Sequence, residues 1–116
     1  VTSYDPTTLA VATDSLEALG YELEVFTLDR RGSFADDVTM SPDRVFRFAA
    51  RSGRAADDPD CLLMLGGSVP YLTLLEDLED ELGLPAVSDG GATLFQTFRM
   101  ADAGSVEGFG ELLRRV

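Results

Sequence analysis

The chain has 116 residues in ordinary globular proportions, 45% hydrophobic and 26% charged, and its 21 acidic and nine basic residues give a net charge of −12. The length predicts one domain over residues 1–116, and the negative charge excludes binding to nucleic acid or anionic lipid. With no histidine and one cysteine, the chain cannot form a histidine-based triad, a zinc finger or an internal disulfide. The sequence predicts no metal site and no cofactor.

The acidity has two explanations. All nine basic residues are arginine, lysine is absent and the acids are spread over the whole chain. This pattern favours a halophilic, salt-adapted protein, because strong salt screens the repulsion within an acidic domain. The other explanation is a docking surface for a cationic partner.

Neither a membrane span nor a secretory leader is visible. No apolar run approaches the roughly 18 residues that a span needs, and no basic and apolar leader opens the chain. We therefore expect a cytoplasmic protein without a membrane partner.

The first half of the chain predicts two helices and one strand. Asp5 and Pro6 form an N-cap and first helical position, and leucines at helical spacing continue this helix to Gly20. Residues 21–28 are typical of a strand, and residues 29–40 have no periodicity and are expected to form a loop. Ser41 and Pro42 repeat the cap and start a helix through Ser52, ended by Gly53.

The second half continues the alternation. The expected elements are a buried strand over 61–65, a helix over 70–83, a short strand over 85–88, a turn over 89–91, a helix over 92–101 and a helix from Ser105 that carries Phe109, Leu112, Leu113 and Val116. Alternating strands and helices predict an α/β fold. Its parallel sheet is flanked by helices on both faces, as in Rossmann-like and flavodoxin-like three-layer domains.

Two helical faces are strongly charged. The helix over 70–83 has an acidic side, which we expect to be solvated, formed by Glu76, Asp77, Glu79, Asp80 and Glu81. The helix over 42–52 has an arginine stripe, continued by Arg54, that is expected to pair with nearby carboxylates.

Ligands of open parallel sheets bind beyond the carboxyl ends of the strands. Three short polar segments are predicted there: residues 2–4, 66–68 and 88–91. Each precedes a helix, so its backbone N–H groups could bind an anion, either a carboxylate or a phosphate. Tight strand-to-helix turns explain the same glycines equally well.

Four segments of the chain carry a resemblance to a known family: Thr2-Ser3-Tyr4, SPDRV over 41–45, LLMLGGS over 62–68 and LGLPAVS over 82–88. They resemble the C-terminal half of the aspartate/glutamate racemase superfamily, in the branch of the maleate cis-trans isomerases and arylmalonate decarboxylases. The resemblance implies a half-domain of a cofactor-free enzyme, which places its site between two similar halves and uses cysteines as acid and base.

This chain departs from the family at the cysteine. Counting back from the LGLP segment places the family cysteine at Gly66, so the resemblance implies no catalytic residue in this half. Cys61 lies five residues earlier, about 16 Å away along a strand, and is expected to be a small buried hydrophobe. A cysteine introduced at Gly66 would be expected to stand at a helix N-terminus and to react quickly.

The resemblance leaves carboxylate binding as the expected property of this half. The implied anion-binding residues are Tyr4, Gly67, Ser68 and Ser88. The expected partners are a small carboxylate and either an N-terminal half or a second copy. The alternative is a non-catalytic interaction domain that dimerises through its C-terminal helix.

Overall fold

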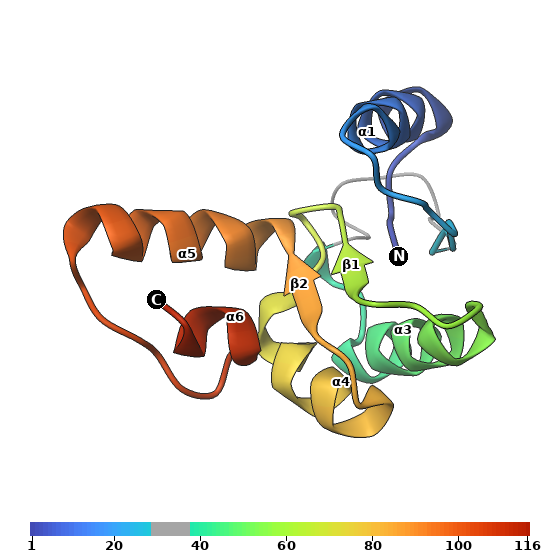
Figure 1. Cartoon of the computed structure of the whole chain (residues 1–116). Coiled ribbons are helices and arrows are strands. Elements are labelled where there is room, and N and C mark those ends of the chain that lie inside the picture. The colour runs from blue at the N-terminus through green and yellow to red at the C-terminus, as the bar shows by residue number, and fades with distance from the viewer. Residues whose placement is uncertain (29–37) are drawn as a thin grey trace.

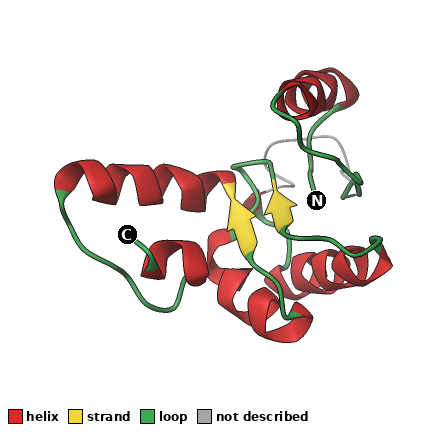
Figure 2. Cartoon of the chain, viewed as in Figure 1, coloured by secondary structure: helices red, strands yellow, loops and turns green. Residues whose placement is uncertain are grey.

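The computed structural model describes residues 1–28 and 38–116, so most of the expected loop over 29–40 lies outside the described residues. Figure 1 shows the arrangement of the elements and Figure 2 their type. In chain order they are α1 (Pro6–Ala18), α3 (Pro42–Ala55), β1 (Leu62–Met64), the 3-10 helix η1 (Leu72–Leu74), α4 (Leu75–Leu82), β2 (Ala86–Ser88), α5 (Asp89–Ala101) and α6 (Glu111–Arg114).

The sheet is parallel, as predicted. β1 and β2 pair in register from Leu62 with Ala86 to Met64 with Ser88. Thr2 extends this arrangement, because it forms parallel bridges with Leu65 on one side and Thr27 on the other. The backbone of the first residues therefore runs beside the end of β1 and aligns the beginning of the chain with the sheet.

One face of the sheet carries the core. Leu62, Met64 and Ala86 are buried and belong to one cluster with the apolar sides of α3 and α4. Successive side chains of a strand point to opposite faces, so Leu63 and Val87 lie on the other side, where they are half-buried.

The second face is covered less completely by α1. Half-buried side chains of α1, among them Leu9 and Leu16, line a groove of about 900 Å³ together with Leu63, Leu65 and Val87. α1 has no buried residue. Helices thus lie on both faces of the sheet, with tight packing on the α3 and α4 side only.

Helix boundaries agree with the sequence where a local signal sets them. The Asp5 carboxylate accepts hydrogen bonds from the N–H groups of Thr7 and Thr8, and Gly83 ends α4 in the left-handed conformation at φ 68°. Gly53 was expected to end α3, but the helix continues to Ala55. The glycine instead gives room to α4, because a Cβ at this position would lie 2.7 Å from Leu82 Cδ1.

Three other predicted elements are wrong. Within 21–28 only Thr27 pairs with the sheet. Its partner is Thr2, which forms a single isolated bridge with this segment. The expected turn over 89–91 is the first turn of α5. The expected helix from Ser105 is a loop up to α6, since Gly104, Gly108 and Gly110 all have positive φ.

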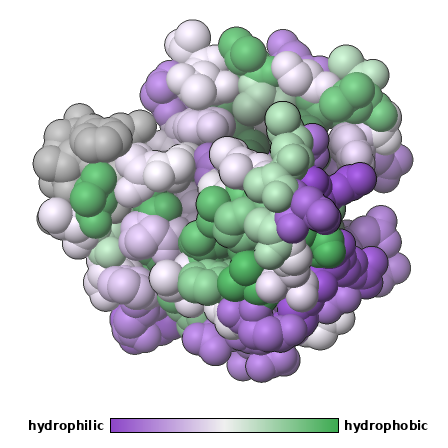
Figure 3. Space-filling view, turned by 90° about the vertical axis from the view of Figure 1, so that its left-hand side faces the viewer, coloured by the Kyte–Doolittle hydropathy of each residue, from purple (hydrophilic) through white to green (hydrophobic). Residues whose placement is uncertain are grey.

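The end of the molecule formed by α5 and α6 has an exposed hydrophobic area. Figure 3 shows this area at the centre of the view, bordered by hydrophilic side chains. Met100 on α5 is 80% exposed. No helix in the described ranges is long and apolar enough to cross a membrane.

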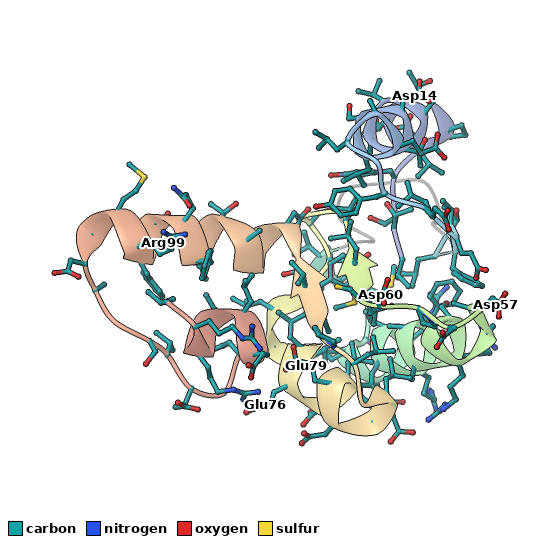
Figure 4. All side chains as sticks on the ribbon, in the orientation of Figure 1. Asp14, Asp57, Asp60, Glu76, Glu79 and Arg99 are labelled. Carbon is teal, nitrogen blue, oxygen red and sulfur yellow. The ribbon has the colours of Figure 1, made fainter. Side chains whose placement is uncertain are left out.

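Side chains on the two charged helical faces form ion pairs with other charged residues. Arg47 pairs with Asp43 at 2.7 Å and Arg54 pairs with Glu81, so the arginine stripe does bind carboxylates. The acidic side of α4 is only partly solvated, however, because Glu76 and Glu79 point toward α6 and bind Arg114 there (Figure 4).

Candidate functional site

The three polar segments meet at the carboxyl edge of the sheet, as the topology predicts. The Ser3 N–H donates to the carbonyl oxygen of Leu65 at 3.3 Å, which holds the first segment beside the end of β1. The Gly66 N–H donates to Asp89 Oδ2 at 2.9 Å, which joins the second segment to the start of α5. Residues far apart in the sequence therefore form one continuous edge.

The predicted anion-binding residues occupy different positions along this edge. Gly67 is exposed, and Tyr4 and Ser68 are half-buried. Ser88 is only 1% exposed, and its hydroxyl accepts the Gly91 N–H at 3.0 Å, which makes it the N-cap of α5. The structure thus leaves the first three at least partly accessible to solvent and buries Ser88.

Asp89 is a residue at this edge that the sequence analysis did not single out. Its two carboxylate oxygens accept the N–H groups of Gly66 at 2.9 Å and Gly90 at 2.7 Å. The signal was present in the sequence, because an acidic residue directly after a buried strand lies at the edge where ligands bind. A side-chain carboxylate therefore already accepts hydrogen bonds from two backbone donors of this edge.

Gly66 is not at a helix N-terminus, because the following helical segment, η1, begins only at Leu72. The residue is buried, its φ is +126°, and a Cβ built on it would lie 2.4 Å from Ser3 Oγ. Side chains rarely adopt this backbone conformation. The expectation that a cysteine here would stand at a helix N-terminus is therefore wrong.

Cys61 precedes β1 and is exposed, so the prediction of a buried hydrophobe is also wrong. The reason is that regular pairing begins one residue later, at Leu62. Partial desolvation raises the pKa of the Cys61 thiol, and the negative charges of Glu79 and Asp60 raise it further. The lone thiol is therefore a poor nucleophile at neutral pH, and it lies at the opposite end of β1 from the polar edge.

We expect two neighbouring glycines of the edge to respond oppositely to cysteine substitution. In a Cys61→Ala background, Gly67→Cys should fold normally and be alkylated by iodoacetamide in the folded chain, because the position is exposed and the atom nearest to a Cβ there is Asp89 Oδ2, at 3.6 Å. Gly66→Cys should lose about 1–3 kcal/mol through backbone strain and the clash with Ser3. Thermal melts and alkylation rates followed by mass spectrometry test both. A Gly66→Cys variant with unchanged stability would contradict the structure.

Comparison with known proteins identifies the fold. No family model matches the chain, and no curated protein does either. Among solved structures, an unliganded arylmalonate decarboxylase matches at a TM-score of 0.82 and 23% identity, over 99% of this chain and 51% of that one. A second arylmalonate decarboxylase structure gives 0.81 at 22% identity, with the same coverage.

A glycine-to-cysteine variant of arylmalonate decarboxylase in a sulfate-associated form also matches. Its TM-score is 0.78 at 22% identity, over 97% of this chain and 49% of that chain. The chain thus spans about half the length of the structures it matches. It has the α/β fold of one half of an arylmalonate decarboxylase, the racemase-like fold that its sequence motifs predict.

Proposed function

We propose that this chain is a carboxylate-binding half of a protein of the racemase, isomerase or decarboxylase type, without a complete cysteine pair of its own. The observation that carries the proposal is the convergence of Tyr4, Gly67 and Ser68 at the carboxyl edge of a sheet with the fold of half an arylmalonate decarboxylase. Edges of this kind bind ligands in open α/β sheets.

The donors suit a small carboxylate. Gly67 is an exposed residue whose N–H has no hydrogen-bond partner among the described residues, and Tyr4 and Ser68, which carry hydroxyl groups, belong to the segments of the same edge. Charge-assisted hydrogen bonds from such groups orient a carboxylate without transferring a proton. Binding and orientation are therefore the functions that this half can supply.

Proton transfer would come from the other half of a two-half protein. The segments at this edge within the described ranges contain no cysteine, and Cys61 lies at the far end of β1. One acid on the facing half would suffice to protonate an enediolate left by decarboxylation, whereas racemisation needs a proton donor on each face. We therefore favour a cofactor-independent decarboxylation over racemisation.

Carboxylate binding can be tested on this chain by calorimetry and by ¹⁵N NMR with propionate, malonate and inorganic phosphate. We expect the amide signals of Gly67 and Ser68 to shift with a carboxylate. Tyr4→Phe should weaken binding about tenfold, as expected for a lost hydrogen bond to a charged group. Tyr21→Phe is the matched control, because Tyr21 is 61% exposed and lies outside this edge.

Three outcomes would contradict the proposal. They are amide shifts confined to other parts of the chain, binding of phosphate alone, and a Tyr4→Phe affinity equal to that of Tyr21→Phe. Size-exclusion chromatography in the same buffers tests the alternative function, since a dimer that releases no heat with any carboxylate would favour an interaction domain.

A further inference from the structure

The groove of about 900 Å³ beside α1 separates β1 from residues 21–26 at the level of the sheet. Figure 1 shows the beginning of the chain between β1 and the segment that follows α1. There Thr2 forms bridges to Leu65 on one side and to Thr27 on the other, so a single backbone fits between the two flanking segments. Past Val1, these segments continue on either side of the groove.

Both of these segments direct backbone groups into the groove. The nitrogen of Val1 donates to the Leu63 carbonyl oxygen at 2.7 Å, and the Thr2 N–H donates to the Phe26 carbonyl oxygen at 3.1 Å. In a parallel ladder the N–H and C=O groups of one residue point to the same neighbouring strand, so the N–H groups of Leu63 and Phe26 also point into the groove. Neither N–H has a hydrogen-bond partner among the described residues. Such unpaired backbone groups are where a further strand can add.

The groove is bounded on both faces of the sheet by apolar or small side chains. Leu9 and Leu16 of α1 line it from one face, and Ser52 of α3 and the following Ala56 line it from the other. A parallel strand that is covered on both faces is apolar along its whole length. The shape and the lining therefore fit an extended apolar segment.

We propose that the groove receives a further parallel strand, supplied by residues joined to Val1 on its N-terminal side. Continuing the register of the existing bridges places four such residues beside residues 22–25 on one side and 60–63 on the other. Continuity with the backbone of Val1 favours a joined segment over a separate peptide, because a joined segment loses less translational freedom on docking. The proposal also explains why residues 21–28 have the composition of a strand.

The register specifies the hydrogen bonds of the added strand. The residue directly before Val1 donates its N–H to the Glu24 carbonyl oxygen and accepts the Phe26 N–H. The second residue before Val1 accepts the Leu63 N–H. Both unpaired donors of the groove are thereby satisfied, which removes the cost of leaving them without a partner.

The test adds four residues, Ile-Val-Ile-Val, directly before Val1. The matched controls are the extensions Gly-Ser-Gly-Ser and Ile-Val-Ile-Pro, and all three chains begin with the same methionine. Glycine and serine supply a backbone without apolar side chains. Proline keeps the apolar character but has no N–H for the Glu24 carbonyl oxygen, so it separates strand pairing from simple filling of the groove.

We expect the Ile-Val-Ile-Val chain to melt about 10 °C above the Gly-Ser-Gly-Ser chain, because it buries more apolar surface. Amide hydrogen exchange, followed by NMR, should slow by at least about tenfold more at Phe26 and Leu63 than at Leu62. Leu62 is the internal reference, since its N–H already donates to the Pro85 carbonyl oxygen. The Ile-Val-Ile-Pro chain should melt within about 3 °C of the Gly-Ser-Gly-Ser chain.

Three outcomes would overturn the proposal. Equal melting temperatures for the three chains would show that the groove does not receive the segment. Unchanged exchange at Phe26 and Leu63 relative to Leu62 would show that the segment does not pair as a strand. If a separate, acetylated Ile-Val-Ile-Val peptide protects these two amides as well as the joined segment does, the occupant is a strand of another molecule.

Discussion

Replacing Glu79 by alanine is expected to lower the melting temperature by roughly 10 °C. Glu79 lies on α4 with a side chain only 10% exposed, and it connects three parts of the chain. Its carboxylate accepts the N–H groups of Ala86 at 3.0 Å and Glu111 at 2.8 Å, and it also contacts the Arg114 guanidinium at 3.5 Å. The side chain therefore holds the start of β2 and the start of α6 against α4.

The size of the effect follows from the groups left behind. Truncation to alanine leaves two largely buried backbone N–H groups without an acceptor. The loss in the free energy of unfolding is about 1–3 kcal/mol for the first of these groups and smaller for the second. Gly110 leaves room for the carboxylate, since a Cβ there would lie 3.2 Å from Glu79 Oε1. For a chain of this length, 1 kcal/mol corresponds to about 4 °C.

The matched control is Glu81→Ala, on the same helix. Glu81 pairs with Arg54, but both side chains are about half exposed, so the pair should contribute less than about 1 kcal/mol. Glu79→Gln should fall between the two, because the amide keeps one acceptor oxygen. Differential scanning calorimetry measures all three. Equal losses for Glu79→Ala and Glu81→Ala would show that the connection to β2 and α6 does not stabilise the fold.

The stability of the whole chain is expected to rise steeply with salt, by more than about 10 °C between 0.05 and 2 M potassium chloride. A net charge of −12 on 116 residues opposes the compact state in dilute buffer. At about 1 M salt the screening length falls to roughly 3 Å, so most of this repulsion disappears. The net stability of a domain is only about 5–15 kcal/mol, so this change affects a large part of it.

The acidic side chains of α4 differ in whether they have arginine partners. Glu76 and Glu81 of α4 have arginine partners in Arg114 and Arg54, so salt weakens these pairs while it relieves the general repulsion. Asp77 and Asp80 are exposed between them, and no arginine of the described residues pairs with either. The variant Asp77→Asn/Asp80→Asn should therefore raise the melting temperature in dilute buffer and have little effect in molar salt.

Thermal melts at both salt concentrations decide between the two explanations of the acidity. A steep rise supports salt adaptation. A flat curve would contradict it and would favour the acidic docking surface for a cationic partner. Sodium chloride and potassium chloride at equal concentration should give the same result, since screening depends on ionic strength.

The sequence by itself determined the parts of this protein that depend on neighbouring residues. An acidic cap before a proline starts α1, a glycine in the left-handed conformation ends α4, and a continuous apolar run forms β1. Parallel strands place their carboxyl ends at one edge, so the meeting of the segments 2–4, 66–68 and 88–91 also followed from the sequence. Each of these features is fixed by backbone preference or by the alternation of strands and helices.

Only the tertiary structure decided the features that depend on distant partners. Residues 21–28 have the composition of a strand, but a strand needs a paired backbone, and Thr2 pairs with them only at Thr27. Gly53 lies inside α3, where the missing side chain leaves room for Leu82 of α4. Glu79 accepts hydrogen bonds from the starts of β2 and α6 and is not a solvated acid. Asp89 became part of the edge because its carboxylate reaches the Gly66 N–H. The partners in these contacts are 23 or more residues apart, except for Glu79 with Ala86, so local patterns could not specify them.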